Sequence, residues 1–370
     1  QQKRSSYQEN QMIKLQRLID KYIGSILIFF LSFLKVFDKK KNIKKRFLII
    51  KLWAIGDSVI SLVLIKAIKT LYNGAKVDVL IRNQNKDIFD CYPLDNIHNM
   101  DKKFTKFMFK NIRKYDVVID CEPYLNLSAI YGFILGKKRI GFSDQFRSLL
   151  YNNKIKFNKK QHMVQNYLDM VRSLGKKYDV DKLEKMTPPK KNIIKIKDFL
   201  KKNKIKKCVG ISVGVGGSAK NRMWYEKRFA TLSDKIIKEL KLDVVFIDSP
   251  NNDYIVQEII SHMSQKAHIA TKGFDLKDRI ALISRCSVFI SNDSGLMHVG
   301  AAQGCRTIGL FGPNTPILWG PYGKNNIGIY KTRLPPSIDN VKAIFKDEKR
   351  MKYMGAISVN DVFLTIKKKI

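Results

Sequence analysis

Short apolar runs alternate with helix-like segments along most of the chain, and this alternation constrains the fold more than any other feature. Segments such as 77–81 and 243–248 are rich in Val and Ile and have the length of buried strands, whereas 59–72 carries apolar residues three and four positions apart, as a helix does. Strands that alternate with helices form a parallel sheet covered by helices. The sequence therefore predicts an α/β fold.

Two sets of strands and helices are separated by a polar, lysine-rich stretch that contains Pro188 and Pro189. A chain of 370 residues exceeds what one hydrophobic core usually serves, so we place a domain boundary in this stretch. The prediction is a segment 1–45 followed by two Rossmann-like domains, 46–187 and 188–370, that face each other across a cleft.

The composition is that of a folded protein, with 45% hydrophobic and 11% aromatic residues. The five cysteines are scattered, odd in number and never form a C-x-x-C pair, which argues against a disulfide framework or a zinc site and favours a reducing compartment. The net charge of +38 has two interpretations: a solvated surface in a lysine-rich proteome, or attraction to a polyanion. No nucleic-acid-binding module is recognisable, so we predict no nucleic-acid partner.

The segment before residue 46 favours an anionic membrane surface as the polyanion. Residues 23–34 are uncharged, and as a helix they rise roughly 18 Å, less than the ~30 Å hydrocarbon core of a bilayer. A basic run follows at 39–46. This pattern predicts an amphipathic helix that lies in the membrane interface. The alternatives are a helix packed on the protein's own core and a signal peptide, although no small-residue cleavage site follows.

Ligands of open α/β sheets bind at the carboxyl ends of the strands, and Gly56 and Asp57 directly follow the first strand. A glycine at this point allows a sharp turn or a close approach to a ligand. Asp57 could act as a general base, or it could cap a helix that begins near Val59. Spacing alone leaves both interpretations open.

A loop of small residues, 214–224, follows the first strand of the second domain. Its exposed amides, including those of Gly217 and Ser218, together with the charges of Lys220 and Arg222, suit a phosphate or pyrophosphate. The loop matches G-x-G-x-x-A. However, the next acidic strand end, Asp248, lies farther away than the roughly twenty residues of a dinucleotide fingerprint.

A third turn, at 291–298, joins a strand to a helix. Free amides at the start of that helix form an anion site. We expect Asp293 to be the N-cap, while the amides of Ser294 and Gly295 receive the anion. His298 lies one turn farther along, where it could donate to a substrate or satisfy a buried partner.

Several segments in a fixed order resemble the ADP-heptose:lipopolysaccharide heptosyltransferase family. They are LIIKLWAIGDSVISLVLIKAIK, YDVVIDC, LYNNKIKFNKKQHMVQNYLDMVRSLG, the K-x-R-x-W loop, and ISNDSGLMHVGAAQG followed by GLFGPNTP and WGPYGKNN, spanning about Phe47 to Asn326. The resemblance implies the GT-B fold and an inverting, metal-free transfer from a nucleotide sugar, ADP-heptose, with no cofactor. It also implies a bacterial enzyme that is peripheral on the cytoplasmic face of the inner membrane and acts on a lipid-linked oligosaccharide acceptor.

The resemblance also assigns roles to residues. Asp57 matches the family's proposed base, Arg222 falls where the family contacts the donor diphosphate, and His162 matches a histidine on the acceptor side. Gly56 is also assigned to the acceptor side. The donor-binding set is Gly217, Ser218, Lys220, Arg222, Asp248, Asp293, Ser294, Gly295 and His298. Two departures concern the donor and acceptor: Glu122 and Pro123 stand where the family often has Gln-Gly, and Asp248 and Ser249 replace a Gly-rich, Glu-containing turn.

Three alternatives remain at this point. A transferase of the same family could use a hexose or N-acetylhexosamine donor. An NAD-type oxidoreductase would account for the glycine loop but leaves the Asp293 motif unused. A non-catalytic membrane-binding protein would account for the charge and predicts no activity with any donor.

Overall fold

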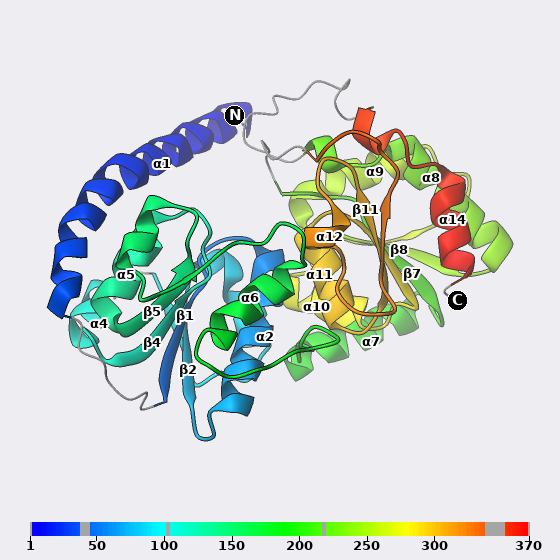
Figure 1. Ribbon diagram of the computed structural model, residues 1–370. Coiled ribbons are helices and arrows are strands. Elements are labelled where there is room, and N and C mark those ends of the chain that lie inside the picture. Colours follow the sequence, from blue (N-terminus) through cyan, green and yellow to red (C-terminus); the bar gives the residue numbers. More distant parts are fainter. Residues whose placement is uncertain (1, 38–44, 101–103, 217–219, 337–351, 369–370) are drawn as a thin grey trace.

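Two six-stranded parallel sheets form the two halves of the molecule, as the computed structural model shows (Figure 1). It describes residues 2–37, 45–100, 104–216, 220–336 and 352–368, and only the backbone of 2–14, 17, 36, 37 and 220. The strands of the first sheet are β1 (Arg46–Ile50), β2 (Lys76–Ile81), β3 (Asn96–Asn99), β4 (Tyr115–Asp120), β5 (Gly136–Phe142) and β6 (Asn153–Ile155). Those of the second are β7 (Cys208–Ser212), β8 (Asp243–Ile247), β9 (His268–Ala270), β10 (Val288–Asn292), β11 (Arg306–Phe311) and β12 (Ile327–Tyr330).

Helices connect the strands and cover both sheets. The first half contains α1 (Gln2–Phe33), η1 (Leu34–Phe37), α2 (Ile55–Leu71), η2 (Asn83–Asn85), α3 (Lys86–Asp90), α4 (Phe104–Lys110), α5 (Asn126–Leu135), η3 (Phe146–Leu150) and α6 (Met163–Arg172). The second contains α7 (Lys190–Lys202), η4 (Lys220–Arg222), α8 (Glu226–Lys235), η5 (Ile236–Leu240), η6 (Pro250–Asn252), α9 (Asp253–Ser261), α10 (Leu276–Ile283), α11 (Gly295–Ala302), α12 (Pro316–Trp319) and α14 (Val359–Lys367).

Alternate residues of the central strands face opposite layers, which explains why these strands read as unbroken apolar runs. Phe47 and Ile49 of β1 belong to the cluster that contains buried side chains of α2 and α6. Leu48 and Ile50 belong to a second cluster with Met108 of α4 and residues of α5. Burial on both faces is typical of parallel sheets.

The strand order, β3-β2-β1-β4-β5-β6, has the Rossmann pattern, and the second sheet repeats it as β9-β8-β7-β10-β11-β12. In this pattern the order reverses between β1 and β4 and between β7 and β10. Ligands bind in the crevice at that reversal, outside the carboxyl ends of the strands. Each half therefore has one switch point where a site is expected.

Several contacts join the two halves. Helix α2 contacts α11, and one apolar cluster contains buried residues of both sheets, for example Ile49 and Val299. Lys277 of α10 forms ion pairs with Asp90 (2.7 Å) and Asp87 (3.2 Å) of α3. The predicted boundary at 187–188 lies in the connection that leads into α7.

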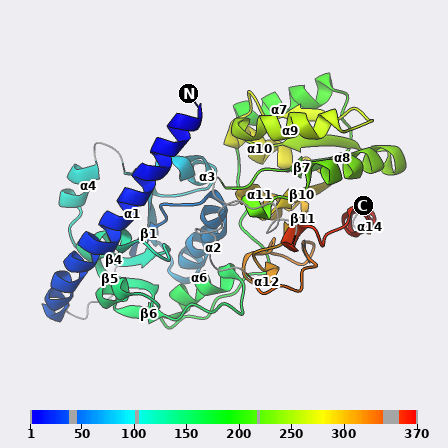
Figure 2. The same cartoon turned by 90° about the horizontal axis from the view of Figure 1, so that it is seen from above.

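The long helix α1 runs over the outside of the first half, beside α5 and η3 (Figures 1 and 2). The sequence predicted a helix in this region, and α1 extends it to 32 residues. In the part of the chain that is described, no helix is both long and apolar enough to cross a membrane. Docking of α1 on a membrane remains a prediction.

Candidate active site

The two switch points face each other across the contact between the halves. At the first, the chain leaves β1 through 51–54 into α2, and leaves β4 through Cys121 and Glu122. At the second, it leaves β7 through 213–216 and leaves β10 into α11. Because the starts of α2 and α11 touch, groups from both domains can reach one ligand.

Asp57 lies in the first turn of α2, which begins at Ile55 and not near Val59. The residue in the N-cap position is Ala54, and no side chain caps this helix. The interpretation of Asp57 as a helix cap is therefore wrong. The sharp turn is also made at Ala54, whose φ of 64° is uncommon for a residue other than glycine. Because α2 begins before Asp57, the Asp57 carboxylate is available for other contacts.

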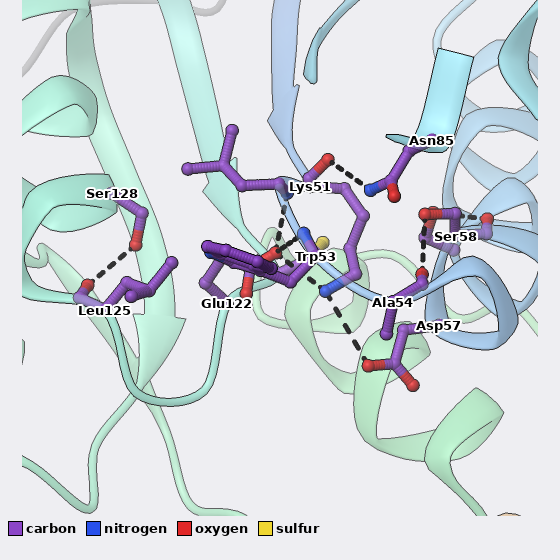
Figure 3. Close-up of polar contacts among 12 residues, drawn as sticks. Lys51, Trp53, Ala54, Asp57, Ser58, Asn85, Glu122, Leu125 and Ser128 are labelled. Atoms are coloured by element: carbon purple, nitrogen blue, oxygen red, sulfur yellow. Dashed lines mark hydrogen bonds and ion pairs between the residues drawn. The ribbon is translucent and has the colours of Figure 1, made fainter. Parts of the chain in front are cut away.

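Lys51 and Glu122 form a buried ion pair next to Asp57 (Figure 3). The ammonium of Lys51 lies 2.8 Å from Glu122 Oε1 and 3.8 Å from Asp57 Oδ2. The same Glu122 oxygen accepts hydrogen bonds from the amides of Leu52 (2.6 Å) and Trp53 (3.0 Å). Glu122 thus holds both the lysine and the loop that leads to Asp57. Burial lowers the pKa of Lys51, but the two carboxylates raise it above its usual value, so the ammonium stays charged.

The pKa of Asp57 is raised to about 6, chiefly because the carboxyl is removed from water. Lys51 opposes the rise, Glu122 and Asp293 add to it, and Arg222 lowers the pKa again. The side chain is nonetheless 22% exposed. A carboxylate with this pKa is ionised at neutral pH and more basic than an ordinary aspartate, which suits a general base.

Arg222 and Asp293 form an ion pair at the second switch point. Their closest atoms, Arg222 Nη1 and Asp293 Oδ2, are 3.2 Å apart, and the side-chain amide of Asn314 donates to the same oxygen at 2.6 Å. Arg222 Nε is buried and has no hydrogen-bond partner among the described residues. Buried donors are rarely left unpaired in native proteins, so the guanidinium retains capacity for a ligand.

Helix α11 begins at Gly295, with Ser294 in the N-cap position. The prediction that Asp293 is the N-cap is wrong, because its carboxylate pairs with Arg222 and Asn314 instead. The hydroxyl of Ser294 lies 2.9 Å from that of Ser291. The helix start still points its positive end into the crevice. Binding of an anion by the amides of Ser294 and Gly295 remains a prediction.

His298 is buried in α11 and packs against Gly56. A Cβ on Gly56 would lie 2.7 Å from His298 Cδ2 and 3.2 Å from the Cα of Gly295. Gly56 therefore permits the close approach of the two domains. Burial, assisted by His162, lowers the pKa of His298 to about 3, so the ring is neutral. Its Nδ1 has no partner among the described residues.

His162 bridges the two domains. As the N-cap of α6 it accepts a hydrogen bond from the amide of Val164 at Nδ1 (3.1 Å), and its Nε2 donates to the carbonyl of Gly320 (2.8 Å). Burial lowers its pKa to about 4. Both ring nitrogens are thus engaged with the protein, and a role toward the acceptor remains a prediction.

Asp248 shapes the loop after β7. One carboxylate oxygen accepts hydrogen bonds from Ser212 Oγ (3.0 Å) and from the amides of Val213 (2.9 Å) and Gly214 (2.7 Å), and the other accepts from Asn252 Nδ2 (2.6 Å). These bonds position the loop in which the donor phosphates are predicted to bind. A direct contact between Asp248 and the donor remains a prediction.

Three of the predicted donor-binding groups cannot be placed. Gly217 and Ser218 lie outside the described residues, as does the side chain of Lys220. Within the described residues, no group of three or more His, Cys, Asp or Glu side chains could hold a metal ion. A metal-free reaction remains a prediction.

Sequence reasoning overlooked two residues of this site and undervalued a third. Lys51 interrupts the apolar run FLIIKL, and a lysine directly after a strand buried on both faces requires a partner if it is buried too. Glu122, noted only as a departure from the family pattern, is that partner. Asn314 carried no such signal, because it lies in a loop that reaches Asp293 only in the folded chain.

Two facing Rossmann-like domains, with a candidate base on one and a candidate anion site on the other, are the arrangement of GT-B glycosyltransferases. Comparison with known proteins makes the class specific. The model of glycosyltransferase family 9 (heptosyltransferase) matches residues 108–346, and the chain belongs to this family.

Individual relatives agree with this assignment. The chain is 27% identical over 323 residues to lipopolysaccharide heptosyltransferase 1 of Campylobacter coli, covering 80% of this chain and 90% of the relative. In structure it is similar to a family 9 glycosyl transferase from Veillonella parvula, with a TM-score of 0.73, 20% identity and coverage of 88% and 97% of the two chains. It is also similar to the ADP-heptose lps heptosyltransferase II of E. coli, with a TM-score of 0.70, 19% identity and coverage of 87% and 98%.

Proposed function

We propose that this glycosyltransferase moves a heptose from ADP-heptose to a lipopolysaccharide core acceptor, with inversion at the anomeric carbon and without a metal. The sugar and the acceptor class are those named for its relatives, the lipopolysaccharide heptosyltransferase 1 of Campylobacter coli and the ADP-heptose lps heptosyltransferase II of E. coli. The observation that carries the proposal is the placement of Asp57, with a pKa of about 6, opposite the pair formed by Arg222 and Asp293.

In the proposed reaction, Asp57 removes the proton from an acceptor hydroxyl as its oxygen attacks the anomeric carbon. The bond between that carbon and the diphosphate oxygen breaks, and ADP leaves with the bonding electron pair. Arg222 and the amides at the start of α11 stabilise the charge that develops on the diphosphate. Removal of one such donor typically raises a barrier by ~2.7–4 kcal/mol. His298 is neutral and can offer a hydrogen bond without adding charge.

Lys51 has a positioning role in this scheme. Its ammonium lies 2.8 Å from Glu122 and 3.8 Å from Asp57. Its charge therefore keeps the Asp57 carboxylate ionised, and its ion pair with Glu122 fixes the loop beside Asp57. Because Lys51 is fully buried, it does not meet the substrate itself. The proposal includes a lipid-linked acceptor and a reaction at the cytoplasmic face of the inner membrane.

The test is calorimetry of the purified chain with ADP, UDP, GDP and NAD in the presence of EDTA, followed by turnover with ADP-heptose and a core oligosaccharide. ADP is expected to bind in preference to the others. Asp57→Asn should lower turnover by roughly 10²–10⁴-fold while ADP affinity stays the same. Preference for UDP would retain the reaction and change the sugar, and preference for NAD would support an oxidoreductase. Normal turnover of Asp57→Asn would refute the role of the base.

A further inference from the structure

Helix α1 is attached to the first domain through polar groups. Asp20 accepts hydrogen bonds from the amides of Asn126 (3.0 Å) and Leu127 (2.8 Å), and the Asn126 side chain donates to the Asp20 carbonyl (2.9 Å) and to Ser25 Oγ (3.1 Å). A Cβ on Gly24 would lie 2.8 Å from the Cβ of Asn126. The side of α1 that faces the domain in this part is therefore polar and small, and these hydrogen bonds fix the helix on the domain.

Most of the large apolar side chains of α1 point away from the domain, whereas Ile28 is fully buried against α5 and η3. Those that point away are 46–63% exposed: Leu15, Leu18, Ile19, Tyr22, Ile23, Ile26, Leu27, Phe29, Phe30 and Phe33, with Leu34 of η1. A helix on the surface of a water-soluble domain has the opposite arrangement, with its apolar stripe against the core. Contiguous exposed apolar surface of this kind marks an interaction site.

Helix α4 extends this surface. Phe109 is 72% and Ile112, just beyond the helix, 50% exposed. Between them and the end of α1 lies an apolar groove of about 770 Å³, whose walls include Leu31, Leu34 and Met108. The two helices lie on the same side of the first half (Figures 1 and 2). The groove joins their apolar side chains into one surface.

Lysines border this surface. Lys21 of α1, Lys106 and Lys110 of α4, and Lys114 just after α4 are exposed. Among the described residues of the two helices, every exposed charged side chain is a lysine. Apolar side chains bordered by lysines match the boundary between the acyl chains and the anionic headgroups of a bilayer. A symmetric contact between two copies of the chain would instead place lysine against lysine.

We propose that α1 and α4 together form a docking face for an anionic lipid bilayer, with acyl chains entering the groove between them. Neither helix crosses the bilayer, since no described helix is long and apolar enough to do so. The sequence pointed to residues 1–45 alone, and the structure adds α4 and the groove.

The docking face lies close to the catalytic cleft along the chain. Asp20 of α1 accepts hydrogen bonds from the amides of Asn126 and Leu127 at the start of α5. Glu122, four residues before Asn126, accepts hydrogen bonds from the loop beside Asp57. A lipid-anchored acceptor could keep its anchor in the bilayer while its sugar reaches Asp57. This last step rests on the proposed function, whereas the docking itself does not.

The first test is cosedimentation of the full chain with vesicles of phosphatidylglycerol and phosphatidylcholine, compared with phosphatidylcholine alone. The chain should bind the anionic vesicles at least tenfold more tightly, and 0.5 M salt should weaken this binding. The double variants Phe30→Ser with Phe33→Ser, and Phe109→Ser with Ile112→Ser, should each lower the affinity at least tenfold. Leu364→Ser, on α14 of the other domain and 55% exposed, is the matched control and should bind like the parent chain.

A second measurement tests contact directly. The fluorescence of the tryptophan introduced by Phe109→Trp should be quenched by brominated lipids in anionic vesicles. That of the tryptophan introduced by Leu364→Trp should not. Undiminished vesicle binding by the α4 variant, or equal quenching of both tryptophans, would overturn the proposal. A third result would also overturn it: no vesicle binding, together with a dimer in sedimentation velocity that the Phe30→Ser, Phe33→Ser variant abolishes. The apolar surface would then bind a second copy of the chain.

Failure of this proposal can be separated from failure of the proposed function. The α4 variant should retain the parent chain's ADP affinity and its turnover with a soluble acceptor, and lose turnover only with an acceptor embedded in vesicles. Loss of ADP binding in that variant would indicate misfolding, in which case the quenching of Phe109→Trp decides the question. Lack of ADP binding by the parent chain would refute the proposed donor and leave the docking face intact.

Discussion

Asp57 lies between groups of opposite sign, and its protonation should govern the pH dependence of the reaction. Its pKa is raised to about 6 by burial, and only the ionised form can accept a proton. The value of kcat/KM should therefore fall tenfold per pH unit below about 6 and level off above it. Lys51→Met removes a cation that lowers this pKa, so the acidic limb should move to higher pH.

Glu122→Gln is the matched control for this experiment, because Glu122 raises the pKa of Asp57 and its loss should move the limb to lower pH. Opposite shifts would be measured in pH profiles of the two variants with saturating donor. Shifts in the same direction would mean that distortion of the loop, and not charge, controls the profile.

Arg222 should contribute mainly to donor affinity. Its Nε, which has no partner among the described residues, and its contact with Asp293 leave it ready for a charged hydrogen bond to a phosphate, worth roughly 1.5–3 kcal/mol. Calorimetry with ADP should therefore show a loss of about 10- to 150-fold in Arg222→Met. Arg285→Met removes an exposed charge from the same domain and should leave the affinity unchanged.

A substitution of Asp293 tests whether this residue orients Arg222 or contributes to ADP binding by itself. A carboxylate repels a phosphate, so its benefit must come from orienting Arg222, and Asp293→Asn should weaken ADP binding only when Arg222 is present. The double-mutant cycle measures this coupling. Additive losses in the double variant would show that the two residues act independently.

Among the elements, the central strands could be predicted from the sequence and the edge strands could not. Strands β1, β2 and β4, and strands β8 and β10 of the second sheet, are buried and appear as apolar runs rich in Val and Ile. The four that went unrecognised, β3, β6, β9 and β12, are the four edges of the sheets. They are three or four residues long, partly exposed, and in β3 the sequence is Asn-Ile-His-Asn.

The start of α2 shows the same limit in the site. The sequence identified Asp57 as a strand-end carboxylate, but the helix begins two residues before it, directly after Ala54, whose φ of 64° no local pattern predicts. In the same way, Asp293 was recognised and its role was not, since the partner Asn314 is contributed by a distant loop. Contacts between segments far apart in the chain leave no local pattern.

The close contact between α2 and α11 requires a residue without a side chain at position 56. In Gly56→Ala the new methyl would lie 2.7 Å from His298 Cδ2, so the domains must separate or the ring must move. We expect a loss of about 1–3 kcal/mol in the free energy of unfolding and a lower kcat.

Gly132→Ala in α5 is the matched control. Its methyl would lie 3.6 Å from Val118 Cγ1, an ordinary contact, and should stabilise the helix by about 0.5–1 kcal/mol. Urea unfolding of both variants measures the difference. Equal effects would mean that Gly56 is not required for the domain contact.

At the scale of the whole molecule, the two domains are joined by groups whose charge states matter. Lys277 carries two ion pairs to α3, and burial lowers its pKa less than Asp90 and Asp87 raise it. His162 bridges the domains as a neutral ring. The candidate active site takes groups from both domains, so a change that weakens these bridges should also disturb the site.

The bridge through His162 predicts how stability depends on pH. Its pKa in the folded chain is about 4, below the ordinary value of 6.5, so between these values the unfolded chain binds a proton that the folded chain does not. Stability therefore falls as the pH drops from 6.5 to 4, and His162 contributes about 1.4 kcal/mol per pH unit to this slope. His162→Asn, which can still cap α6, should remove that contribution, whereas His262→Asn, at an exposed position after α9, should not. Urea unfolding at several pH values measures the slopes, and an unchanged slope in His162→Asn would show that the bridging ring titrates in the folded protein as it does in the unfolded one.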